Sequence, residues 1–219
     1  MTTNNSISTE KNAAKGIIGG VLIFSLVYAV FRYHIFGGVP WKDFPFFIMN
    51  KIMSMAAFIL FVINFSIGPL KNIYNKVPVS WLNARKSVGM TAFLIALIHV
   101  LMSFILFNPN VYGKFFLENG TMTLLTGLSM LSGVLAFVFL WGYNLSFQTK
   151  LSEDSKFISI ITSRNFLVWA LLTGLIHLFF MGFEGWMNPS GWHGGMPPIS
   201  LVCFTFGAIG YIINLLGRK

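Results

Sequence analysis

Apolar residues recur along this chain in six long runs that short polar segments separate. Each run has about 20 residues, the length that a helix needs to cross the hydrocarbon core of a bilayer. The runs cover Gly16 to Tyr33, Phe46 to Leu70, Ser87 to Phe107, Met122 to Trp141, Phe166 to Phe183 and Ile199 to Leu216. The pattern predicts an all-α fold, a polytopic six-helix transmembrane bundle, which follows a polar tail over residues 1–15.

Composition supports the same fold class. The chain is 55% hydrophobic and only 10% charged, and its mean hydropathy is +0.73. These values exclude a soluble domain and indicate an integral, multi-pass protein in contact with membrane lipid. Short connections and the lack of a repeat predict one domain over residues 16–219. No GxGxxG motif follows a predicted strand, so we expect no nucleotide-binding domain of its own.

The net charge of +9 is distributed unevenly over the connections. Eleven of the fifteen basic residues lie before the first run, between the second and third, between the fourth and fifth, or after the sixth. They are Lys11, Lys15, Lys71, Lys76, Arg85, Lys86, Lys150, Lys156, Arg164, Arg218 and Lys219. Helices that alternate in direction place all of them on one side, and the positive-inside rule makes that side cytoplasmic. The charge therefore predicts both termini in the cytoplasm, in a plasma or inner membrane, and no nucleic-acid partner.

Two histidines stand inside apolar runs that should be parallel. His99 follows Arg85 and Lys86 by 13 to 14 residues, and His177 follows Arg164 by 13. At about 1.5 Å per residue, each imidazole lies roughly 20 Å from the cytoplasmic boundary. An imidazole in hydrocarbon needs a partner, and two at one depth suggest a shared partner. Two neutral imidazoles can hold iron axially, so the pair predicts a b-type haem.

Alternative explanations exist for these features. Either histidine alone could bond a neighbouring backbone carbonyl. Small residues near the pair would make room for a flat macrocycle, although they also serve ordinary helix packing. They are Gly89, Ala96, Ser103 and Gly174. His34 and His193 fall in outer loops, where we expect interfacial or solvated side chains rather than ligands.

Two polar residues precede the apolar part of the second run. Asn50 and Lys51 could bond the carboxylates of a haem whose propionates face outward. The alternative for Lys51 is that its side chain extends to the membrane interface. Cys203, the only cysteine, lies in the middle of the sixth run, where we expect a small buried side chain.

Two stretches of the chain resemble a known family. The first is Trp81, Leu82, Arg85, Lys86 and Gly89 followed by His99, and the second is Ala170, Leu171, Leu172, His177 and Gly182, with Pro197 and Pro198 before the last run. Both are similar to the ferric-reductase-like transmembrane domain, most closely to the six-transmembrane STEAP metalloreductases. The resemblance covers about Trp81 to the C-terminus.

The resemblance implies one haem b with His99 and His177 as axial ligands, placed toward the outer leaflet. It also implies that a cytoplasmic flavin or flavoprotein donates electrons, which pass to an outer acceptor such as ferric iron. Arg85 and Lys86 would then lie near a flavin pyrophosphate, which makes FAD a candidate second cofactor. Trp169, just over two turns before His177, could bridge flavin and haem or simply be a core tryptophan. The chain has no inner-leaflet histidine for a second haem.

Other functions fit the same sequence. A quinone-linked cytochrome b subunit of a larger redox complex would use the same histidine pair. A non-redox structural or transport bundle would carry the histidines incidentally. The sequence leaves open whether the chain is itself a ferric or metal reductase, and whether it forms a homo-oligomer or joins a redox complex.

Overall fold

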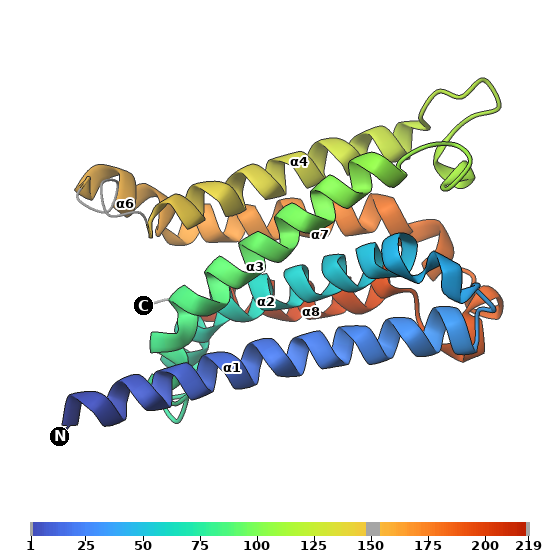
Figure 1. Ribbon diagram of the computed structural model, residues 1–219. Coiled ribbons are helices and arrows are strands. Elements are labelled where there is room, and N and C mark those ends of the chain that lie inside the picture. The colour runs from blue at the N-terminus through green and yellow to red at the C-terminus, as the bar shows by residue number, and fades with distance from the viewer. Residues whose placement is uncertain (1, 148–153, 218–219) are drawn as a thin grey trace.

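The computed structural model describes residues 2–147 and 154–217, and the regular elements within them are helices. Six helical stretches in this part are long and apolar enough to cross a membrane. Their main helices are α1 (Thr2–Ala29), α2 (Met49–Ile73), α3 (Val79–Leu106), α4 (Leu124–Leu145), α7 (Arg164–Trp186) and α8 (Ile199–Leu216) (Figure 1). The prediction of an all-α, multi-pass bundle is confirmed.

Short elements connect these helices. They are the π-helical turns η1 (Val30–Ile35) and η3 (Phe44–Ile48), the 3-10 turns η2 (Trp41–Asp43), η4 (Gly113–Phe115), η5 (Pro189–Gly191) and η6 (His193–Gly195), and helix α6 (Ser155–Ile161). Side-chain caps fix several helix starts. The Thr123 hydroxyl accepts a hydrogen bond from the Thr126 amide, and Ser163 caps α7 in the same way. Such caps satisfy amides that the first turn leaves unpaired.

Helix α2 is the central element of the bundle. It packs against α1, α3 and α8, while α7 packs against α4 and α8. More than half of its membrane-length window is buried, a larger share than in any of the other five stretches. The remaining stretches expose many large apolar side chains, including Phe104, Ile105 and Leu124. A bundle in water would pay heavily for such surfaces, whereas lipid accepts them.

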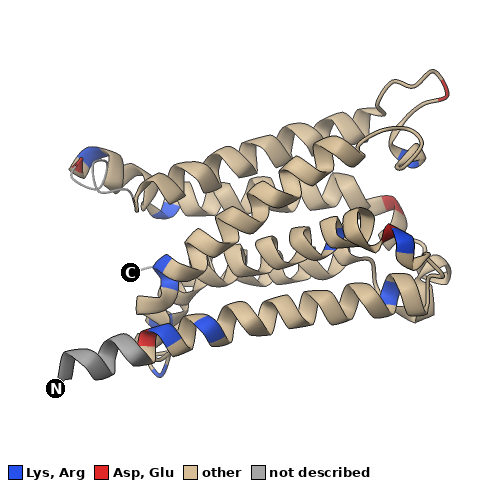
Figure 2. Cartoon of the chain, in the orientation of Figure 1, with Lys and Arg blue, Asp and Glu red and all other residues tan. Residues whose placement is uncertain are grey.

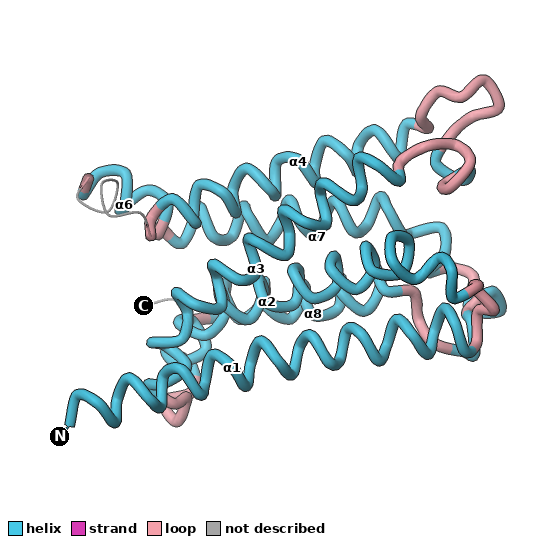
Figure 3. The backbone as a smooth tube through the Cα atoms, in the orientation of Figure 1, coloured by secondary structure: helices cyan, strands magenta, loops and turns pink. Residues whose placement is uncertain are grey.

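The two ends of the bundle differ in charge and in loop content. Both termini lie at one end, together with α6, and the longer loops lie at the other end (Figures 1 and 3). Lysine and arginine gather at the end that carries the termini (Figure 2). Three of the predicted basic positions, Lys150, Arg218 and Lys219, lie outside the described residues. Both ends of the described chain thus reach the same side of the bundle.

The helices extend further than the apolar runs. Arg85 and Lys86, expected in a connection, lie on the early turns of α3, which begins at Val79. The polar tail likewise continues α1, which begins at Thr2. Helical hydrogen bonding therefore carries on beyond the end of each apolar run. Long basic side chains tolerate that position because they reach water from a helix.

Candidate cofactor site

A cavity of about 870 Å³ lies within the bundle and brings the two candidate histidines together. His99 enters it from α3 and His177 from α7, and α2, α4 and α8 supply the other walls. Its volume is within the range that small-molecule and cofactor sites have. The walls are largely apolar, with Phe58, Phe61, Phe104, Phe137, Leu140 and Leu178 among them. The cavity opens at the end opposite the termini, because Tyr112, Lys114 and Trp192 also line it.

The His99 imidazole has a defined tautomer. Its Nδ1 lies 2.7 Å from the Asn50 carboxamide oxygen. A carboxamide oxygen only accepts hydrogen bonds, so Nδ1 carries the proton and donates it. The Asn50 amide nitrogen in turn donates to the Ser103 hydroxyl at 3.1 Å, so the amide bonds two residues of α3. The Nε2 of His99 is left with a free lone pair, the form in which imidazole binds iron.

His177 reaches the same state with different partners. Its Nδ1 lies 2.8 Å from the backbone oxygen of Ser129 on α4, and this oxygen is also an acceptor only. The Ser129 hydroxyl donates to the backbone oxygen of His177 at 3.0 Å, which ties α4 to α7 at this level. Nδ1 therefore donates, and Nε2 again keeps its lone pair.

The two imidazoles thus form a matched pair of nitrogen donors. Neither Nε2 has a hydrogen-bond partner among the described residues. Bonds from Nδ1 to protein acceptors are the usual way in which proteins orient histidine ligands and raise their basicity. The described residues contain no group of three or more His, Cys, Asp or Glu that could hold a metal ion alone. The pair suits an iron that a macrocycle already coordinates on four sides.

Glycines let the helices approach the site closely. A Cβ atom at Gly133 on α4 would lie 2.7 Å from Nδ1 of His177. At Gly174 on α7 it would lie 2.8 Å from the Phe58 ring, and at Gly207 on α8 it would lie 2.9 Å from the same ring. The absence of a side chain at Gly133 therefore leaves space for the imidazole, while the other two glycines leave space for a wall of the cavity.

The mouth of the cavity carries positive charge among aromatic rings. The Lys51 ammonium lies 4.4 Å from the Phe47 ring centroid, 5.1 Å from that of Tyr33 and 5.4 Å from that of Tyr112. Such contacts stabilise a cation that is partly removed from water. The Lys51 side chain, predicted to bind a haem carboxylate, lines the cavity.

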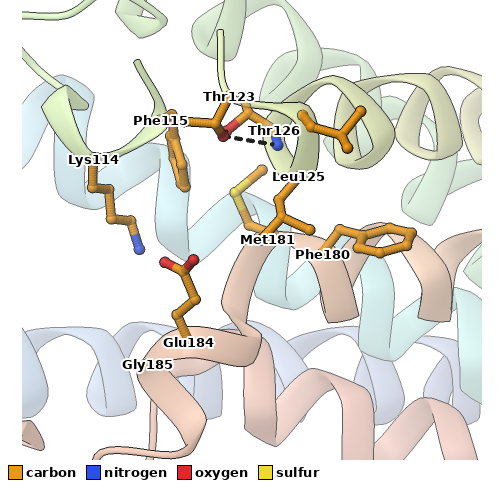
Figure 4. Close-up of a pocket in the computed structure, with 10 residues that line it drawn as sticks. Lys114, Phe115, Thr123, Leu125, Thr126, Phe180, Met181, Glu184 and Gly185 are labelled. Atoms are coloured by element: carbon orange, nitrogen blue, oxygen red, sulfur yellow. Dashed lines mark hydrogen bonds between the residues drawn. The ribbon is translucent and has the colours of Figure 1, made fainter. Parts of the chain in front are cut away.

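A smaller cavity of about 140 Å³ adjoins the mouth between the start of α4 and the end of α7. Lys114 and Glu184 point toward one another across it, and Phe115 and Met181 line both cavities (Figure 4). Partial desolvation, together with the charge of Lys51, lowers the pKa of Lys114 below its usual range. The mouth therefore combines several cations with a single facing carboxylate.

Three predicted site residues lie away from this cavity. Arg85 donates from Nε to the backbone oxygen of Asn64 at 3.1 Å, and Lys86 is exposed next to it. Trp169 is 57% exposed on the surface of α7. The cavity lining includes none of the three. Their predicted roles concern a flavin at the other end of the bundle.

Two expectations about outer histidines have different outcomes. His34 is only 7% exposed, so the expectation of a solvated side chain was wrong. Its ring stacks on Trp41 with a centroid separation of 4.0 Å, and its Nδ1 lies 2.7 Å from the Val39 oxygen. A local turn with adjacent aromatic residues covers it. His193 is exposed at the cavity mouth, as expected, and Cys203 is buried in the cavity wall.

Sequence reasoning missed the partners of the histidines. Asn50 was expected to bond a haem carboxylate, but it orients His99 instead. Ser129 and Gly133 were not singled out, although their spacing of four residues places both on one face of a helix. That spacing of small residues in the fourth run is the signal from which the contact with His177 could have been predicted.

No known protein-family model matches the chain, and no curated protein is similar to it.

Proposed function

We propose that this protein is a single-haem, b-type transmembrane electron-transfer protein, with His99 and His177 as axial ligands. The observation that carries the proposal is the matched tautomer pair: both imidazoles line one cavity, and both donate their Nδ1 proton to a protein acceptor. The bound haem would supply one-electron chemistry at its iron. A structural or transport bundle has no need for two such fixed donors at one level.

The residues around the pair have defined tasks in this proposal. Asn50 and Ser129 hold the two rings, so the donor nitrogens would stay in place when the site gains or loses an electron. Rigid ligands keep the reorganisation that accompanies electron transfer small. The apolar walls exclude water, and this burial tunes the reduction potential.

The direction of electron flow follows from the charge asymmetry and the family resemblance. We propose that both termini are cytoplasmic, because basic residues gather at their end of the bundle. The motifs around His99 and His177 support a distant relationship to the ferric-reductase-like domain. A cytoplasmic flavin or flavoprotein would then donate electrons near Arg85 and Lys86. The cavity mouth would face an outer acceptor such as ferric iron, in a plasma or inner membrane.

A vesicle experiment tests the proposal. Protein purified from cells with ample haem should show a Soret band and contain about one haem per chain. When vesicles contain this protein and enclosed ferricyanide, external dithionite should reduce the ferricyanide faster than in empty vesicles. Vesicles with His177→Ala, which loses an axial donor, are the matched control. A chain that takes up no haem under these conditions would contradict the proposal.

A further inference from the structure

Arg32 is a buried cation with no acidic partner. It lies in η1, directly after α1, and it lines the cavity although only 5% of its surface is exposed. One of its terminal nitrogens donates to the backbone oxygen of Met196, and its Nε has no hydrogen-bond partner. The described residues offer it no ion pair. A guanidinium buried without a counter-charge is costly, so an anion at this position would be strongly favoured.

The other outer cations have different surroundings. Lys51 lies over three aromatic rings, and Lys114 faces Glu184. Lys42 is exposed and does not line the cavity. Arg32, whose Cζ lies 5.5 Å from the Tyr33 ring centroid, is therefore the buried cation of the cavity wall, and its Nε is a donor without a hydrogen-bond partner among the described residues. A guanidinium presents its N–H groups as a planar fork, which matches the two oxygens of a carboxylate.

We propose that Arg32 anchors a carboxylate of the molecule in this cavity, namely a propionate side chain of the haem. This inference rests on the proposed function. Arg32 lies before Trp81, so it is outside the part of the chain that resembles the ferric-reductase-like family. The anchor would fix the haem with its propionates toward the cavity mouth. Lys51 presents a point-charge ammonium rather than a planar fork, so it would contribute less to this contact.

The test compares two iron porphyrins that differ only in their carboxylates. Haem and haem dimethyl ester have the same ring and iron, but the ester has no negative charge at its propionates. The full chain, purified without haem, is titrated with each porphyrin, and the low-spin spectrum reports binding. The preference is the affinity for haem divided by that for the ester. The two porphyrins partition differently into detergent, but this difference is the same for every variant. It therefore cancels when the preference is compared between variants.

Arg32→Gln should lower the preference about tenfold, because one charge-assisted contact is lost. Its affinity for the ester should stay that of the wild type. Lys42→Gln, which removes a cation at the same end but outside the cavity, should keep the full preference. Should Arg32→Gln fail to fold, Arg32→Lys keeps the charge and loses the fork, and it should lower the preference by a smaller factor.

An unchanged preference in the folded Arg32 variant would overturn the inference. That result would follow if Arg32 bound a free carboxylate from solution, since such an anion does not distinguish the two porphyrins. If neither porphyrin gave a low-spin spectrum in the wild type, that result would contradict the proposed function and, with it, the proposed role of Arg32. A preference that drops only in the Arg32 variants supports the anchor.

Discussion

At the scale of residues, neighbours define what each polar side chain in the bundle can do. His99 and His177 have the same tautomer because their partners, a side-chain amide and a backbone carbonyl, both accept only. The sequence identified both histidines, because an imidazole within an apolar run is conspicuous. It could not identify Asn50 and Ser129 as partners, since each lies almost fifty residues away from its histidine. Contacts between helices depend on helix rotation, which the apolar pattern constrains only loosely.

Asn64 offers a test of how much a buried polar group without a hydrogen-bond partner destabilises this bundle. Its side chain is fully buried in α2, and neither its amide nitrogen nor its amide oxygen has a hydrogen-bond partner. Asn64→Leu should raise the free energy of unfolding by about 1–3 kcal/mol, because it removes an unsatisfied buried group. Thermal unfolding in detergent measures the change.

Asn214 is the matched control for this substitution. It is equally buried, but its amide donates to the Gly210 oxygen at 2.8 Å and to the Ser66 hydroxyl at 3.4 Å. Asn214→Leu should therefore destabilise the protein. If Asn64→Leu lowered the unfolding temperature as much as Asn214→Leu, Asn64 would have a partner that the contacts among the described residues do not include.

At the scale of elements, the number and order of the membrane-length helices could be predicted, but their ends could not. Runs of apolar residues report where the chain crosses hydrocarbon, so six spans followed directly from the pattern. Helix α3 begins eight residues before its apolar run, since backbone hydrogen bonds continue where lipid ends. The π-helical turns η1 and η3 have no signal in the apolar period. They nevertheless matter, because η1 places Arg32 at the cavity.

The contact between α4 and α7 should depend on one glycine. Gly133→Ala would push its new methyl group against Nδ1 of His177, and the imidazole would have to move. We expect a loss of haem affinity of about tenfold or more, in the range seen when the support of a metal ligand is disturbed. Haem titration of the purified chain measures it.

Gly127→Ala is the matched control on the same helix. No atom lies within 4 Å of a Cβ atom built at Gly127, so the new methyl group meets open space. This variant should bind haem as the wild type does, and alanine favours the helix slightly more than glycine. Equal haem affinities in the Gly133 and Gly127 variants would show that α4 does not confine the His177 ring.

At the scale of the whole molecule, the cavity opens toward only one end of the bundle. Its mouth lies at the end opposite the termini, where fewer basic residues gather. Net charge and run order were enough to predict that both termini share a side, and both ends of the described chain do reach the same end of the bundle. The cavity itself could not be predicted, because five helices from distant parts of the chain form it.

Thiol labelling tests the orientation of the bundle in the membrane. Cys203 is the only cysteine, so Cys203→Ser gives a background without thiols. In this background, Ser190→Cys places an exposed thiol in η5, near the cavity mouth, and Ser159→Cys places one in α6, at the other end. An impermeant thiol reagent on intact cells should label the first variant and leave the second unlabelled. The reverse pattern would place the termini outside.

The central claim is that His99 and His177 together hold one haem iron. The most direct measurement is the dithionite-reduced minus oxidised spectrum of the wild type, His99→Ala and His177→Ala, with His193→Ala as control, since His193 lines the same cavity. The wild type and the control should show a sharp low-spin α band, and both axial variants should lose it. If either His99→Ala or His177→Ala kept a normal low-spin spectrum, the proposed ligand pair would be wrong.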